Sequence, residues 1–344
     1  MTNAKRRDFR APEPQLDGKS ILVTGGTGSF GRRFVRTVLD RYKPERLIVF
    51  SRDELKQFEM QHEPGFEGHP ALRFFLGDVR DDGRLEMALR DVDIVVHAAA
   101  LKQITAAEYN PFECIRTNVH GAENLVRAAL RAGVRQVVAL STDKAANPIN
   151  LYGASKLASD KIFIAGNNLA GVAPTRFGVV RYGNVIGSRG SVVPFFRKLL
   201  ADGVTALPVT DERMTRFWIT LQQGVDLVLS TLVLMRGGEI FVPKIPSMRV
   251  IDLAALMSPG TAPRFIGIRP GEKVHEALIA EEEARNTYDL GDRYVIAPSF
   301  RFWSADGLDP RARPIGDESF SYMSNNNSEW LSKGELEALL AETP

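Results

Sequence analysis

The sequence contains a single cysteine, Cys114, among its 344 residues. One thiol excludes an internal disulfide framework and a metal cluster held by several thiolates, and we expect no metal centre. Cys114 itself is best interpreted as a small buried side chain rather than a reactive thiol.

The chain also lacks an excess of charge of either sign and lacks long apolar runs. Its 44 basic and 42 acidic residues nearly cancel, whereas proteins that bind nucleic acid or membrane surfaces usually carry a basic stripe or block. No run approaches the roughly 18 apolar residues that span a bilayer, and no apolar segment follows the basic N-terminus as in a signal peptide. We therefore expect a cytoplasmic protein with neither a nucleic acid nor a membrane as its partner.

What the chain does contain is a regular alternation of apolar strand patterns and helical patterns. This alternation predicts parallel strands with right-handed crossovers, which is an α/β Rossmann-like, doubly wound sheet. The expected strands are residues 21–23, 46–50, 72–76, 93–97, 134–140 and 178–181. We expect four parts along the chain: a flexible arm (1–17), a dinucleotide-binding domain interleaved with later segments (18–182), a smaller, mainly substrate-binding α/β domain (183–300) and a C-terminal extension (301–344).

A glycine-rich stretch, TGGTGSFG, follows the first expected strand directly and precedes a helical pattern. Gly25, Gly28 and Gly31 are spaced G-x-x-G-x-x-G. Without side chains, the backbone can turn tightly and approach a pyrophosphate, and the helix N-terminus that follows offers free N–H groups and a positive dipole end. In the order strand, loop, helix, this stretch predicts a dinucleotide site.

The second strand ends in Ser51-Arg52-Asp53, where dinucleotide-binding proteins contact the adenosine ribose. Arg52, with Lys56 nearby, suits the 2′-phosphate of NADP. A carboxylate at Asp53 suits the ribose hydroxyl of NAD, so NAD stays an alternative, and Arg52 could also be a solvated surface charge. After the third strand, Asp78 is placed either to accept a hydrogen bond from adenine or to cap the next helix. His97 lies inside an apolar run and is interpreted as a core histidine.

The stretch LSTDKAANPINLYGASK, residues 140–156, collects the groups that can carry chemistry. Tyr152 and Lys156 are four residues apart, so a helix places them on one face, where the ammonium would lower the pKa of the phenol. Thr142, Asp143 and Lys144 follow an apolar strand and should lie at the carboxyl edge of the sheet, where ligands bind. From these residues alone, a polar turn followed by an ordinary helix is an equal alternative.

Other charged residues are candidates for a nucleotide-sugar site. Lys102 follows the alanines after the fourth strand and should face the same cleft. Arg216 and Arg269 lie in charged clusters of the second domain, and arginine suits a nucleotide diphosphate through bidentate contacts, although each cluster could be a solvated turn.

With TGGTGSFG, SRDELKQ, GDVRD, HAAALK, STDK and YGASK in this order, the chain resembles the extended short-chain dehydrogenase/reductase family over about residues 16–300. Within that family it is most similar to the inverting UDP-N-acetylglucosamine 4,6-dehydratases of pseudaminic acid biosynthesis. The strings that support this are RYGNVIGSRGSVVPFF, LPVTDERMTRFWIT, GGEIFVPKIPSM and IRPGEKVHE. The chain departs from the pattern at Gln103, where histidine is expected, which leaves the preferred UDP-sugar open.

The resemblance implies a role for each matching position. Asp143 would be the acid and Lys144 the base, with Tyr152, Lys156 and Thr142 serving oxidation at C4; retaining enzymes typically carry Asp-Glu in place of Asp143-Lys144. NADP, tightly bound and regenerated in each turnover, would contact Gly25, Thr27, Gly28, Ser29, Phe30, Gly31, Ser51, Arg52, Asp53, Glu54, Leu55, Lys56, Asp78, Val79, Ala98, Thr117, Tyr152, Lys156 and Val185. The UDP-sugar, UDP-N-acetylglucosamine or a close relative, would contact Lys102, Asn184, Arg189, Ala206, Arg216, Arg269 and Glu272.

The resulting hypothesis is a hydro-lyase with inversion at C5, and the resemblance also implies a homo-oligomer. It requires an Asp143 pKa above the ordinary value and a Lys144 pKa below it, the latter through nearby Lys156 and the nicotinamide. The alternatives are a 4-epimerase, a retaining 4,6-dehydratase, a 5,6-dehydratase or, more remotely, a non-catalytic NADP-binding sensor.

Overall fold

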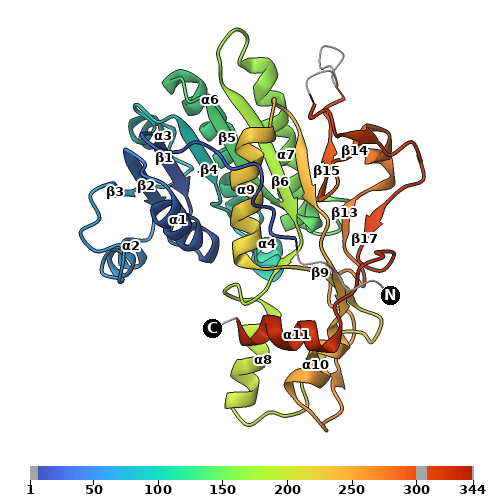
Figure 1. Cartoon of the computed structure of the whole chain (residues 1–344). Helices are drawn as coiled ribbons and strands as arrows, with labels where there is room; N and C mark the ends of the chain where they lie inside the picture. Colours follow the sequence, from blue (N-terminus) through green and yellow to red (C-terminus); the bar gives the residue numbers. More distant parts are fainter. Residues whose placement is uncertain (1–6, 300–307, 343–344) are drawn as a thin grey trace.

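A ten-stranded sheet runs through the centre of the part that the computed structural model describes, residues 7–299 and 308–342 (Figure 1). Its order is β16-β14-β15-β10-β6-β5-β4-β1-β2-β3. The seven strands from β10 to β3 are parallel, and each of β15, β14 and β16 pairs antiparallel with its neighbour. The strand bounds are β1 (Ser20–Thr24), β2 (Arg46–Ser51), β3 (Leu72–Leu76), β4 (Ile94–His97), β5 (Gln136–Thr142), β6 (Arg176–Tyr182), β10 (Ile240–Pro243), β14 (Thr287–Asp289), β15 (Arg293–Ile296) and β16 (Arg313–Pro314).

Helices cover both faces of this sheet, which explains why the central strands are apolar throughout rather than alternating. On one side α3 (Asp82–Ala88), α6 (Gly121–Ala132) and α7 (Leu151–Leu169) pack in succession, while α1 (Ser29–Arg41) packs with α9 (Leu221–Leu234) (Figure 1). The α/β Rossmann-like prediction is confirmed, and each of the six strands expected from the sequence is present. Helix α5 (Pro111–Ile115) continues as a π-turn, η1 (Arg116–His120), into α6.

A second, smaller core of buried side chains belongs to the helices that Figure 1 shows below the carboxyl edge of the sheet. It includes Val193, Phe196, Leu253 and Leu336. These side chains come from α8 (Val192–Ala201), α10 (Val250–Met257) and α11 (Lys333–Ala341). The short strands beside it are β7 (Asn184–Val185), β9 (Thr215–Ile219) and β11 (Ser247–Arg249) in one sheet, β8 (Pro208–Val209) with β12 (Arg264–Phe265), and β13 (Ala277–Ile279) with β17 (Tyr322–Met323).

The segments after residue 183 therefore serve both regions. Strands β10, β14 and β15 extend the main sheet, whereas α8 and α10 build the second core, and the C-terminal extension adds Leu336 to it. Within residues 7–299 and 308–342 we find no helix with the length and apolar character needed to cross a bilayer.

The N-terminal segment differs from the expected flexible arm. Phe9 and Leu16 are buried in the main core, and Arg7 forms an ion pair with Glu329 and donates to the carbonyl of Lys244. Residues 7–17 are thus packed against the body, because two apolar side chains in a polar stretch find room beside the sheet. Residues 1–6 of the predicted arm lie outside the described residues.

Candidate active site

The loops at the carboxyl ends of β1, β2, β4 and β5 line one cavity of about 1200 Å³, together with segments of the second region. That position follows from topology, since the carboxyl ends of parallel strands meet at one edge. Most predicted site residues lie on its wall. Three predicted site residues are not among the described residues that line the cavity: Glu54, Leu55 and Ala206. Leu55 is exposed to solvent on α2 (Glu54–Gln61).

The glycine loop forms the floor of one end of this cavity. Gly25 adopts a positive φ of 65°, and a Cβ there would lie 2.9 Å from the backbone nitrogen of Ala99. A Cβ on Gly31 would lie 2.4 Å from the Cα of Gly26. Only glycine fits these two positions, and the N-terminus of α1 opens toward the cavity beside them. The loop therefore fits the pyrophosphate of a dinucleotide.

The residues expected at the adenosine end form two separate sets of ion pairs. Asp53 caps α2 by accepting from the backbone of Lys56 and also pairs with its ammonium group. Arg52 is half-exposed, with Nη1 3.7 Å from Oδ2 of Asp78, and Asp78 also accepts from Arg80. The alternative that Asp78 caps the next helix is wrong, because Asp81 caps α3.

Tyr152 and Lys156 lie in the first turns of α7, which begins where the side chain of Asn150 accepts from the backbone of Gly153. Both side chains are buried, and Lys156 Nζ donates to the carbonyl of Leu140 at 2.7 Å. Burial raises the pKa of Tyr152 to about 12, against the opposing effects of the Lys144 charge and a hydrogen bond with Thr142. The predicted lowering of this pKa by Lys156 is therefore wrong in the protein alone, because burial dominates and the Lys156 ammonium is directed to a backbone carbonyl.

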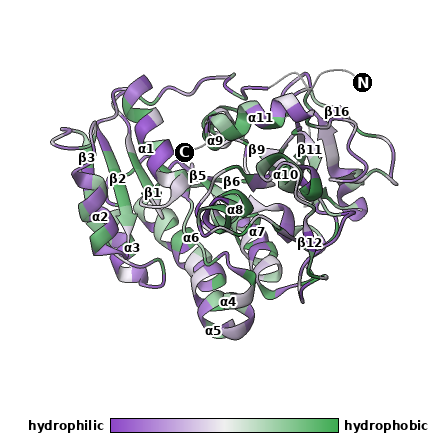
Figure 2. Cartoon of the chain, turned by 90° about the horizontal axis from the view of Figure 1, so that it is seen from below, coloured by the Kyte–Doolittle hydropathy of each residue, from purple (hydrophilic) through white to green (hydrophobic). Residues whose placement is uncertain are grey.

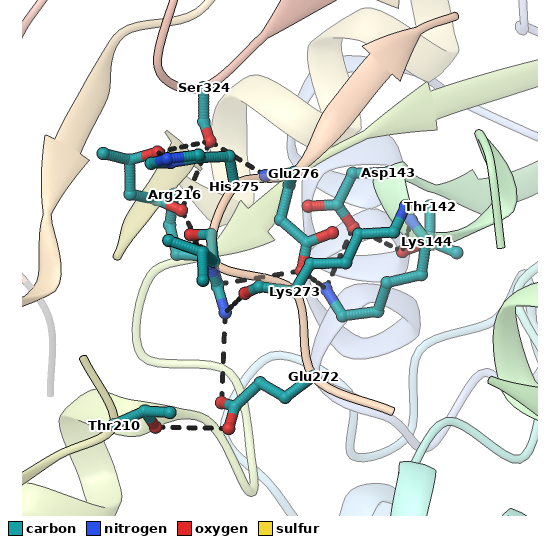
Figure 3. A network of polar contacts seen from close by, with 12 residues as sticks. Thr142, Asp143, Lys144, Thr210, Arg216, Glu272, Lys273, His275, Glu276 and Ser324 are labelled. Atoms are coloured by element: carbon teal, nitrogen blue, oxygen red, sulfur yellow. Dashed lines mark hydrogen bonds and ion pairs between the residues drawn. The ribbon is translucent and has the colours of Figure 1, made fainter. Parts of the chain in front are cut away.

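Asp143 and Lys144 form the short 3-10 turn η2 (Asp143–Ala145) directly after β5. Lys144 Nζ lies 3.1 Å from Oδ1 of Asp143 and 3.1 Å from Oε1 of Glu276. Figure 3 shows how these side chains lie relative to one another. Thr142 donates to the same Asp143 oxygen at 2.8 Å. Lys144 is thus held between two buried carboxylates.

The pKa directions of this pair agree with the hypothesis for the acid and disagree for the base. Burial raises the pKa of Asp143, although the Lys144 charge opposes it, and the predicted direction is confirmed. Burial alone would lower the pKa of Lys144, but the carboxylates of Asp143 and Glu276 outweigh it and raise that pKa above its ordinary value. The predicted lowering is wrong because the sequence did not reveal the second carboxylate.

The other end of the cavity carries the residues expected to bind the sugar nucleotide. Arg216, on β9, is buried and donates to the carbonyls of Lys273 and Val274. Glu272 accepts from Arg269 and from Thr210. The remaining predicted residues on this wall are Lys102, Asn184 and Arg189.

Glu276 is the functional candidate that sequence reasoning missed. It is the last residue of the string IRPGEKVHE and directly precedes β13. The sequence carries no signal for this role, because a glutamate next to a short apolar run is usually solvated, and only the fold buries Glu276 beside Lys144. The two residues interpreted as structural are confirmed as such. His97 is buried with Nδ1 2.8 Å from the hydroxyl of Thr24, and Cys114 is fully buried.

Comparison with known proteins now identifies the family. A family model described as polysaccharide biosynthesis protein matches residues 21–298. The chain belongs to this family. Its resemblance to the short-chain dehydrogenases/reductases is confirmed by the same match and by the solved structures that share the fold.

Among curated members of the family, the chain is 54% identical to a UDP-N-acetylglucosamine 4,6-dehydratase (inverting) from Campylobacter jejuni, covering 94% of this chain and 98% of that protein. It is 42% identical to a UDP-glucose 4-epimerase from Rickettsia canadensis, covering 81% and 82%.

Solved structures give the same picture of the family's fold. Pen from Bacillus thuringiensis aligns with a TM-score of 0.85 at 34% identity, covering 95% of this chain and 98% of that one. A dTDP-glucose 4,6-dehydratase from Streptomyces venezuelae with NAD bound aligns with a TM-score of 0.66 at 27% identity, covering 74% and 86%.

Proposed function

We propose that the protein is a UDP-N-acetylglucosamine 4,6-dehydratase, a hydro-lyase that inverts the configuration at C5. The observation that carries this proposal is the ion pair of Asp143 with Lys144 in the same cavity as Tyr152 and Lys156. An epimerase needs no acid and base for C5 and C6. The similarity to the Campylobacter protein of that name, over nearly the whole chain, supports the same activity.

A nicotinamide cofactor, when bound, would accept hydride from C4 and return it to C6. The residues of the chain move the protons. The ionised form of Tyr152 accepts the proton of the C4 hydroxyl, which Thr142 orients. Burial opposes this form, whereas the Lys144 charge and the hydrogen bond with Thr142 favour it, and Lys156 lies one helical turn along α7 from the phenol. Once C4 is a ketone, the hydrogen on C5 is acidic, and the neutral amine of Lys144 removes it as a proton. The C6–O bond breaks as Asp143 protonates the oxygen, and water leaves. A solvent proton delivered to the opposite face of C5 completes the inversion. Tyr152 then returns its proton to solvent, and the Asp143–Lys144 pair again holds one shared proton.

The raised pKa of Lys144 does not prevent this step. Moving one proton along the 3.1 Å hydrogen bond from Lys144 to Asp143 makes a neutral amine and a protonated carboxyl together. The net charge of the pair is unchanged, so burial favours the neutral form, which is the form that elimination requires.

We propose NADP as the cofactor because Arg52 and Lys56, which line the adenosine end, can bind a 2′-phosphate.

We also propose a homo-oligomer. The helices α4 (Ile104–Tyr109) and α5 project from the body in Figure 2. They expose Tyr109 and Phe112, at 87% and 75% of their surface, as an oligomer contact would. Entry of the product into pseudaminic acid synthesis is part of the same proposal.

One experiment tests the function. The purified protein is incubated with UDP-N-acetylglucosamine, the loss of one water is followed by mass spectrometry, and the C5 configuration of the product is determined by NMR. We expect water loss with an inverted C5. A product of unchanged mass would indicate an epimerase, an unchanged C5 a retaining dehydratase, an unsaturated product a 5,6-dehydratase, and unaltered substrate a sensor.

A further inference from the structure

Glu276 reaches the catalytic pair from a distant part of the chain and is held there firmly. Its backbone nitrogen donates to Ser324 Oγ at 2.9 Å, and the nitrogen of Ser324 donates back to the carbonyl of Glu276 at 2.8 Å. Ser324 in turn contacts the hydroxyl of Thr215 on β9. Figure 3 shows the carboxylate directed toward Lys144. The loop before β13 and the C-terminal extension thus fix this acid at one position.

Burial alone would raise the pKa of the Glu276 carboxyl, but the positive charges of Lys144 and Arg216 lower it below its ordinary value, so this group is a carboxylate. Oε1 lies 3.1 Å from Lys144 Nζ and 3.7 Å from Nε of Arg216. Oε2 is buried and has no hydrogen-bond partner among residues 7–299 and 308–342. A buried charge with an unsatisfied oxygen costs stability, so an acid that serves the fold alone would be better placed elsewhere. The geometry therefore favours a role in the reaction.

We propose that Glu276 is a positioning residue for the dehydration: it holds Lys144 beside Asp143 and, by its negative charge, sets the pH range in which that pair carries a single shared proton. This inference rests on the proposed function, because that function assigns Lys144 and Asp143 as base and acid. Other charged or titratable groups also face the pair: Tyr152 from α7, Lys102 from the loop after β4, Arg216 from β9, and Lys273 from the loop before β13.

The sign of the effect follows from proton counting. The pair is active with one shared proton, is inactive after it gains a second, and is inactive after it loses the first. A nearby negative charge favours proton uptake, so Glu276 moves both limits to higher pH. Removing the charge must shift both limbs of the pH–rate profile to lower pH, whereas mere loosening of the site would lower the rate without moving them.

The test compares Glu276→Gln, which removes the charge at constant shape, with Glu276→Asp, which keeps it. Water loss from UDP-N-acetylglucosamine is measured as a function of pH. Independently of any substrate, acetylation of Lys144 by acetic anhydride is followed against pH by mass spectrometry of its peptide. For Glu276→Gln we expect both limbs and the labelling midpoint to fall by about one pH unit. Glu276→Asp should return the limbs to their wild-type positions at a reduced rate.

Two further variants keep the proposal testable if Glu276→Gln does not fold. Arg216→Gln removes a positive charge close to the same groups and should move the labelling midpoint the other way, to higher pH. Glu239→Gln is the matched control, because Glu239 is a buried carboxylate just before β10. It therefore lies at the amino ends of the parallel strands, whereas the cavity lies at their carboxyl ends. It should leave the midpoint and limbs in place.

The outcomes separate the inference from the proposed function. The role of Glu276 would be overturned if the limbs of the pH–rate profile and the Lys144 labelling midpoint stayed at wild-type values in Glu276→Gln. It would also be overturned if the labelling midpoint did not rise in Arg216→Gln. Wild-type protein that leaves UDP-N-acetylglucosamine unaltered would overturn the proposed function, and the labelling midpoint would still decide whether Glu276 controls the Lys144 amine.

Discussion

The two ends of the cavity are built in different ways. The cofactor end is built by segments that follow one another in the first half of the chain, namely the loops after β1, β2 and β4 and the first turns of α7. Its floor is the backbone of the glycine loop. The acid–base end combines η2, β9, the loop before β13 and, through Ser324, the C-terminal extension. It concentrates buried charges. The first end is shaped by space and the second by electrostatics, so the two should respond differently to substitution.

Lys144→Ala tests the electrostatic end and should have the largest effect. Loss of the base is expected to lower turnover roughly 10²–10⁴-fold and to stop exchange of the C5 hydrogen with solvent deuterium, while NADP binding is retained. Exchange is followed by NMR in deuterium oxide and binding by calorimetry. Lys161→Ala, on the exposed face of α7, is the control. Exchange at the wild-type rate would show that another group is the base.

Gly31→Ala tests the steric end. Its Cβ would meet the Cα of Gly26 at 2.4 Å, so the loop must distort, and we expect destabilisation of about 3 kcal/mol together with loss of cofactor binding. Gly83→Ala, in α3, is the matched control, since its Cβ has no neighbour closer than 3.6 Å. Urea unfolding measures the stability of both variants. Equal stability of the two variants would mean that the glycine loop is not sterically constrained.

The buried state of His97, the last residue of β4, can be tested through the pH dependence of stability. Burial lowers its pKa from 6.5 to about 3. Because the folded-state pKa is depressed, the unfolded chain binds the proton first, and stability must fall as pH drops from 6.5 toward 3, by up to about 1.4 kcal/mol per pH unit. The free energy of unfolding is measured for wild type and for His97→Asn between pH 7 and pH 5, and its change with pH is compared. The variant should lose less stability over this range, and identical slopes would contradict the assignment.

Arg52→Ala should have the smallest effect. The half-exposed guanidinium is expected to strengthen NADP binding about tenfold through the 2′-phosphate and to leave NAD affinity nearly unchanged. Calorimetric titration with each cofactor measures the ratio. Arg33→Ala, an exposed arginine on α1 that is absent from the cavity wall, should leave the ratio unaltered. A proportional loss for both cofactors would indicate that Arg52 does not select between them.

The cofactor end was largely predictable because its signals are local. A strand that runs into Gly25, Gly28 and Gly31 specifies its own turn, and the spacing of Tyr152 and Lys156 specifies a shared helix face. The charged neighbourhood of Lys144 was not predictable in the same way. Its raised pKa depends on Glu276, and the buried state of Tyr152 outweighs the lysine that sequence spacing places near it.

The Rossmann-like sheet, the glycine loop and the chemical groups after β5 follow from the amino-acid sequence, because backbone periodicity and short-range sterics depend on residues close together in the chain. Folding alone brings Arg7, Phe9 and Leu16 against the body and Glu276 to Lys144. Those contacts join residues far apart in the chain, and they depend on how two cores close over one cavity. Electrostatic energies there follow distance and burial, and neither is set by sequence spacing.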